Sequence, residues 1–187
     1  MATPTSLPAT FVAGNVLTAA EMNGLRGAFR ILQVVSTTKT DTFSASIAAG
    51  ADTAITGLSA TITPSSTSSK ILAVVNVSGA QVTNTLGYVA VRLYRGATQI
   101  GSGAASSNRT EALAATRLST ASGANIVTVA GNYLDSPATT SATTYAVHLT
   151  SLATTTTTHC VNRSSTDADD EAYARPSSTI TLFEVSA

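Results

Sequence analysis

The two histidines and the single cysteine are the residues that could support nucleophilic catalysis. A Ser/His/Asp or Cys/His hydrolase needs an imidazole within hydrogen-bond reach of its nucleophile. His148 lies in a threonine-rich segment, which is typical of a surface-facing strand residue. His159 and Cys160 are adjacent, and adjacent strand residues point to opposite faces, so these side chains cannot pair directly. No nucleotide-binding or nucleophile-elbow motif is present in the sequence. We therefore expect a non-enzymatic protein that needs no cofactor.

A dense group of carboxylates is the one candidate for metal binding. It comprises Asp167, Asp169, Asp170 and Glu171. Oxygen ligands at alternate positions of a loop can wrap around Ca²⁺. The segment has no glycine to make the sharp turn of an EF-hand loop, so a solvated acidic loop is the favoured interpretation. We expect no metal site.

Composition excludes several classes of function. The formal net charge is +0 and only 11% of residues are charged, so no basic field would attract nucleic acid. One cysteine excludes an intrachain disulfide framework. The first residues lack the basic and apolar regions of a signal peptide, and no run of 18 apolar residues is present. We expect a soluble chain that is made in the cytosol and does not insert into membranes.

The elements that must position any site are short β-strands. Apolar and polar residues alternate in 86–94 and 143–152, which predicts strands with one buried face. The apolar run at 71–77 predicts a strand buried on both faces. The last strand, 179–185, is expected to bury Ile180 and Leu182. Further strands are expected at 31–38, within 42–63, at 98–100 and at 125–134, whereas 154–158 is β-prone with nothing apolar to bury. About eight strands with no helix between them favour an all-β fold, an antiparallel jelly-roll-like β-sandwich.

The N-terminal residues carry the only convincing helix signal. Thr18 and Glu21 fit a capping box, and an apolar stripe follows at helical spacing. The predicted helix, 18–29, is short, and two interior glycines cost roughly 1 kcal/mol each, so it needs a partner surface. The expected docking residues are Leu17, Met22, Leu25 and Phe29. We therefore divide the chain into an attachment segment, 1–30, with an extended arm and one short α-helix, and a β-sandwich head, 31–187.

Several strings together resemble a known class of viral proteins. VAGNVLTAAEMN followed by ILQVV is similar to the N-terminal attachment segments of tailed-bacteriophage structural proteins. ITPSSTSSKILAVV, VRLYRGATQIGSG and YLDSPATTSATTYAVHL resemble phage fibre and knob domains, which are similar to the trimeric jelly rolls of the tumour-necrosis-factor and C1q type.

The resemblance implies a homotrimeric virion protein. Residues 1–30 would dock on another virion protein of the tail or capsid, and the β head would face outward for host attachment, as in a tail fibre or receptor-binding protein. A head fibre or capsid decoration (cement) protein is the alternative. The chain has no segment for a long shaft, so the resemblance is to a short fibre, a knob or a decoration protein. A standalone carbohydrate-binding adhesin module is the rival from another class.

Two sets of residues are candidates for contacts with partners. Tyr88, Tyr94 and Tyr145 could line a threefold interface, or they could belong to the ordinary core of the sandwich. Polar loop tips are the natural place to bind a host surface glycan. The candidates there are Arg109, Asn162, Arg163 and Asp169.

Overall fold

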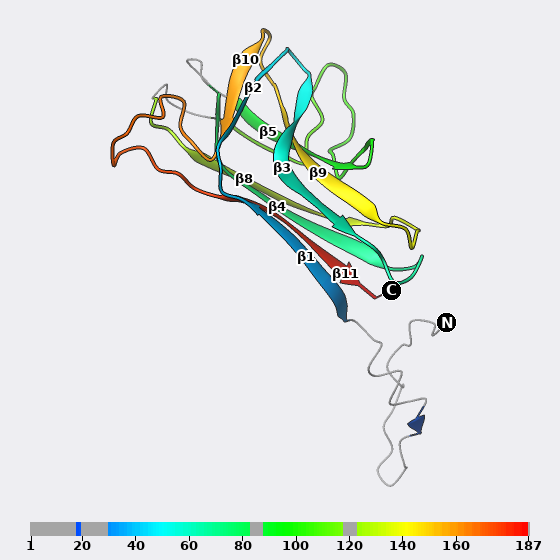
Figure 1. Cartoon of the computed structure of the whole chain (residues 1–187). Helices are drawn as coiled ribbons and strands as arrows, with labels where there is room; N and C mark the ends of the chain where they lie inside the picture. Colours follow the sequence, from blue (N-terminus) through cyan, green and yellow to red (C-terminus); the bar gives the residue numbers. More distant parts are fainter. Residues whose placement is uncertain (1–17, 20–29, 83–87, 118–122, 187) are drawn as a thin grey trace, which may run out of the picture.

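The computed structural model describes residues 18–19, 30–82, 88–117 and 123–186 of the chain (Figure 1). All secondary-structure elements of this part are β-strands. The predicted short helix is not seen, because its span lies outside the described residues except for Thr18 and Ala19. No helix suited to crossing a membrane is found among the residues described.

In the described residues, eleven antiparallel strands form two sheets that pack face to face (Figure 1). The six-stranded sheet has the order β1-β11-β4-β10-β2, with β8 on the other side of β4. Its strands are β1 (Ile31–Lys39), β2 (Phe43–Ile47), β4 (Lys70–Val82), β8 (Val127–Asp135), β10 (Thr157–Val161) and β11 (Ser178–Val185). The five-stranded sheet has the order β3-β9-β5-β6, with β7 paired to β5. Its strands are β3 (Asp52–Ile62), β5 (Tyr88–Arg95), β6 (Thr98–Ile100), β7 (Ala114–Arg117) and β9 (Thr143–Thr150).

The core lies between the sheets and follows the alternation of the sequence. In β9, Tyr145, Val147 and Leu149 are fully buried, while Ala146 and His148 between them are only half-buried. Ile180 and Leu182 of β11 are fully buried, as predicted. The strands predicted at 86–94 and 98–100 form a hairpin, in which β5 and β6 pair antiparallel across a turn at Gly96 with φ of 57°.

Strand β4 is the centre of the six-stranded sheet, and its environment differs from the prediction. It pairs with β8 along one side and with β11 and then β10 along the other. The prediction that the run 71–77 is buried on both faces is wrong. Ile71, Ala73, Val75 and Val77 face the core, whereas Val74 on the outer face is 38% exposed. The second sheet covers one face only.

Strand β10 is the element that the sequence predicted least well. The β-prone stretch was placed at 154–158, whereas the strand runs from Thr157 to Val161 and pairs with β2 and β4. Every residue of β10 except Thr158 is buried, although only Cys160 and Val161 are hydrophobic. A hydrophobic pattern cannot reveal a strand in which half of the buried positions are polar.

Asp135, at the end of β8, ties the two sheets together. Its carboxylate accepts two hydrogen bonds from Arg95 Nη1 of β5, at 2.9 and 2.8 Å, and one from the Tyr145 hydroxyl of β9, at 2.7 Å. Burial and the bond to Asp135 both raise the pKa of Tyr145, so its hydroxyl remains a donor at any physiological pH. Asp135 is 5% exposed, so this is a directional, charge-assisted link at one end of the core.

A second buried carboxylate, Glu184 of β11, organises the loop between β3 and β4. It accepts bonds from the Ser65 amide and hydroxyl, at 2.7 and 2.6 Å, and from Gln33 Nε2 of β1, at 2.6 Å. Burial opposes its ionisation, but the hydrogen bonds outweigh that effect and hold the pKa of Glu184 below its usual value. A serine-rich loop thus supplies the donors that a buried charge requires.

Replacing Asp135→Ala should lower the free energy of unfolding by about 3 kcal/mol, because it leaves Arg95 and the Tyr145 hydroxyl without their acceptor. Urea unfolding followed by circular dichroism measures this change. The exposed Glu171→Ala is the matched control and should leave the urea midpoint unchanged. Equal midpoints for both variants would show that the link does not stabilise the fold.

His159 makes stability depend on pH, because it is 1% exposed and burial lowers its pKa from 6.5 to about 4. Its Nε2 lies 2.9 Å from Thr157 Oγ1, and no hydrogen bond to Nδ1 is found in the described part of the chain. In the unfolded chain His159 therefore takes up a proton as the pH falls below 6.5, whereas in the folded chain it stays neutral until about pH 4. Stability should fall by roughly 2–3 kcal/mol across this window and lose nothing further from this group below it. An NMR titration that found His159 protonating near pH 6.5 in the folded protein would contradict this.

Candidate functional site

The polar loop 162–177 connects β10 to β11 and contains most of the predicted ligand-facing residues. It has no apolar run to bury, and turns hold its shape. Asn162 and Asp167 adopt positive φ angles of 58° and 49°, and the Asp170 carbonyl accepts a bond from the Tyr173 amide. Thr166 donates its amide to the Gly123 carbonyl, so the loop also rests on the segment that precedes β8.

Asn162 is a structural residue of this loop rather than a contact for ligands. It is fully buried, its amide donates to the carbonyls of Lys39 and Asp41, and its oxygen accepts a 2.6 Å bond from Ser178 Oγ. These bonds tie the end of β1 to the start of β11. The prediction that Asn162 faces a ligand is therefore not supported, because its polar atoms are already engaged inside the protein.

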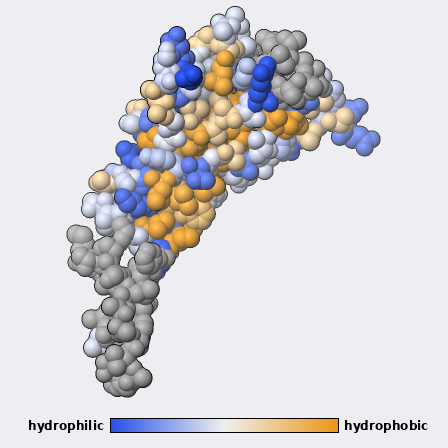
Figure 2. Space-filling model, turned by 180° about the vertical axis from the view of Figure 1, so that it is seen from behind, coloured by the Kyte–Doolittle hydropathy of each residue, from blue (hydrophilic) through white to orange (hydrophobic). Residues whose placement is uncertain are grey.

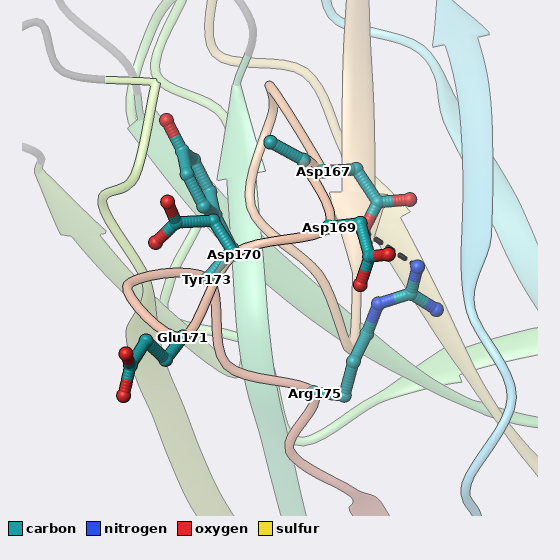
Figure 3. Close-up of a pocket in the computed structure, with 7 residues that line it drawn as sticks. Asp167, Asp169, Asp170, Glu171, Tyr173 and Arg175 are labelled. Carbon is teal, nitrogen blue, oxygen red and sulfur yellow. Dashed lines mark ion pairs between the residues drawn. The ribbon is translucent and has the colours of Figure 1, made fainter.

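Asp167 forms the centre of the charged part of the loop. Its carboxylate lies 3.0 Å from Arg163 Nη1. It also lies 2.8 Å from Arg175 Nη2 (Figure 3). Arg163 also donates to Cys160 Sγ over 3.5 Å, which closes the loop over β10. Two of the loop's positive charges are thus committed to one carboxylate.

An open hollow of about 610 Å³ lies on this loop. It is lined by Asp167, Ala168, Asp169, Asp170, Glu171, Tyr173 and Arg175. The carboxylates do not converge on one point, since those of Asp170 and Glu171 point away from Asp169 (Figure 3). Nowhere in the described residues do three or more His, Cys, Asp or Glu side chains group so that they could hold a metal ion. What the hollow offers is hydrogen-bond acceptors, a tyrosine ring and one arginine.

Arg109 does not join this group. It lies in the loop between β6 and β7, where its guanidinium donates to Ser106 Oγ over 2.7 Å. That loop and the loop 162–177 lie on different sides of the molecule (Figure 1). The structure therefore brings Arg163 and Asp169 into one loop and separates Arg109 from them.

The three tyrosines proposed for an interface lie in three different environments. Tyr145 is fully buried and belongs to the core, the alternative that the sequence left open. Tyr94 stacks on His148 with ring centroids 4.1 Å apart. Tyr88 is 36% exposed, with the Arg117 guanidinium 5.2 Å from its ring centre. The docking residues Leu17, Met22, Leu25 and Phe29 lie outside the described residues.

A polar cluster on the outer face of the five-stranded sheet escaped the sequence analysis. Asp52 accepts bonds from Arg92 Nη1 at 2.7 Å and from the Tyr94 hydroxyl at 3.3 Å, and it lies 2.6 Å from His148 Nδ1. Burial opposes ionisation of Asp52, but the bonds to His148 and Arg92 outweigh it and lower its pKa. The alternation of apolar and polar residues in 86–94 places Arg92 and Tyr94 on one face of their strand. It does not show that the strands carrying Asp52 and His148 lie beside them.

This cluster resembles part of a catalytic arrangement but lacks a nucleophile. An aspartate that orients an imidazole is two-thirds of a hydrolase triad. No serine, threonine or cysteine of the described chain is hydrogen-bonded to His148, so the pair has no group to activate. His159 and Cys160 are both buried, on opposite faces of β10.

Adding Ca²⁺ or EDTA should leave the melting temperature unchanged, because Asp167 is neutralised by two arginines and the other carboxylates diverge. Differential scanning calorimetry in both buffers checks this, with Asp169→Ala as the control. A Ca²⁺-dependent rise in melting temperature that Asp169→Ala abolishes would establish a metal site in this loop.

Comparison with known proteins gives no family assignment. No protein-family model matches the chain, and the search of curated proteins found none that matches it in sequence. The geometry of the head and of its surfaces is therefore what supports a function.

Proposed function

We propose that the chain is a non-enzymatic structural protein of a bacteriophage virion. In this proposal it is a homotrimer that docks through residues 1–30 on another virion protein and presents a jelly-roll-like head outward. Attachment to the host surface, as in a tail fibre or receptor-binding protein, is the function we favour over capsid decoration.

The observation that carries this proposal is that Arg30, where the segment 1–30 joins the head, and the polar loop 162–177 lie at opposite ends of the six-stranded sheet. The segment 1–30 enters at Arg30, whose carbonyl accepts a bond from the Ser186 amide and whose amide donates to Ser186 Oγ. Strand β11 runs from the loop 162–177 to this point (Figure 1). Eight residues of strand span about 26 Å. The polar loop thus lies at the opposite end of the six-stranded sheet from the attachment segment.

A polar loop held at the free end suits contact with a host glycan. Asp169 is exposed and lines the hollow, and Arg163 of the same loop is paired with Asp167. Polar side chains held by a rigid sheet are the usual means of recognising hydroxyl-rich ligands. No charged field is needed for such a ligand, which agrees with a net charge of +0.

Deleting residues 1–30 should abolish incorporation into phage particles while the head still folds, because the described core lies between the two sheets. Immunoblots of purified particles measure incorporation, and the melting temperature of the truncated chain reports its folding. Asp169→Ala is the matched control, which should enter particles normally and lose binding to host cells. Normal incorporation of the truncated chain would refute docking through this segment. Host binding by the free truncated head without particle incorporation of the full chain would favour the adhesin instead.

A further inference from the structure

An apolar row crosses the outer face of the six-stranded sheet near the attachment end. Val34 of β1 lies opposite Phe183 of β11, Phe183 opposite Leu72 of β4, and Leu72 opposite Leu134 of β8. Four neighbouring strands therefore place one large apolar side chain each at the same level. The row spans about 14 Å, from three strand spacings.

This row continues into a larger apolar surface. Ile31 lies on one side of it and Val74 on the other, and we call the six residues the apolar face: Ile31, Val34, Leu72, Val74, Leu134 and Phe183. Ile31, Val34 and Leu134 are 57%, 54% and 54% exposed. Figure 2 shows hydrophobic residues gathered over the lower end of the molecule, where β1 begins and β11 ends. Contiguous exposed apolar surface of this kind marks an interaction site.

The apolar face does not serve the core of the single chain. The inner residues of β4 fill the space between the sheets, and the outer residues Leu72 and Val74 have no sheet above them. The sequence of β4 is that of a strand buried on both faces, yet among the described residues only the five-stranded sheet covers it, on one face. A partner for the outer face is therefore to be sought beyond the described residues.

The surroundings of the apolar face are suited to contact between identical surfaces. The outward-facing residues beside it are uncharged, including Ser36, Thr181, Asn132 and Asn76. Two charged residues lie at its margin: Lys70, which donates to Ser136 Oγ over 2.6 Å, and the exposed Arg30, which precedes Ile31. A surface that meets a copy of itself must avoid like charges facing each other, and the six residues of the apolar face carry none.

We propose that the apolar face is the surface through which copies of this chain contact one another around a common axis. This inference rests on the proposed function, since the attachment segment ends at Arg30, immediately before Ile31 of the apolar face. Segments that dock together on one virion protein bring the apolar faces of their heads together at high effective concentration. Contact there buries the second face of β4.

The test is the oligomeric state of the full-length protein by light scattering after size exclusion. The wild-type chain is expected to be a trimer at micromolar concentration and insensitive to salt, because the contact is apolar. Leu134→Glu places a carboxylate in the apolar face, at the β8 end of the row, and is expected to weaken association roughly a hundredfold or more, giving a monomer. Thr128→Glu lies on the same strand and the same outer face beyond the apolar face, and should remain trimeric. Circular dichroism must show the same fold for all three.

The contrary results separate this surface from docking of the protein on the virion. A monomeric wild-type chain overturns this proposal together with the homotrimer, and stronger binding of an apolar dye after deletion of residues 1–29 would then show that this segment covers the face. A trimeric Leu134→Glu variant would show that the copies do not associate through the apolar face, while remaining consistent with a trimeric virion protein. Loss of particle incorporation on deletion of residues 1–30 tests docking and is independent of both.

Discussion

The fold depends on a few buried polar links that fix how its strands align. Apart from Tyr145, the core is built from valine, isoleucine, leucine and alanine, whose packing is non-directional and fixes neither the offset of the sheets nor the path of the loops. Asp135 fixes the two sheets at one end, Glu184 fixes the loop before β4, and Asn162 joins the end of β1 to the start of β11. Each is buried, so an unpaired partner would be costly, and the native alignment is the one that pairs them all.

The outer faces of the two sheets differ in chemistry, and this difference indicates how the head is used. The five-stranded sheet carries the network of Asp52, Arg92 and His148, whose charges are satisfied within the chain. The six-stranded sheet carries uncovered Val34 and Leu134. Covering a hydrated polar face costs free energy, whereas covering an apolar face is favourable because it removes apolar surface from water. The six-stranded sheet is therefore the side that association favours.

Function and assembly share one geometry in this proposal. Strand β11 begins at the polar loop and ends beside Arg30, so a single strand connects the ligand end to the attachment end. Contacts between copies at the attachment end would leave the loops around Asp169 free at the other end. Several loops held in parallel would then bind a repetitive surface more tightly than one, because later contacts are intramolecular.

The sequence by itself determined the strands whose apolar residues alternate, such as 143–150 and 179–185, and the burial of Ile180 and Leu182. It also placed the polar loop after Val161, because nothing in that stretch could enter a core. Only the tertiary structure decided which strands pair, and with that the meeting of Asp52 with His148 and the burial of Asn162. Local patterns encode which side of a strand is apolar, but partners far apart in the chain are chosen by packing and by the pairing of buried polar groups. For the same reason, only the assembled sheets showed that the outer side of β4, with Val74 38% exposed, is not covered by the described part of the chain.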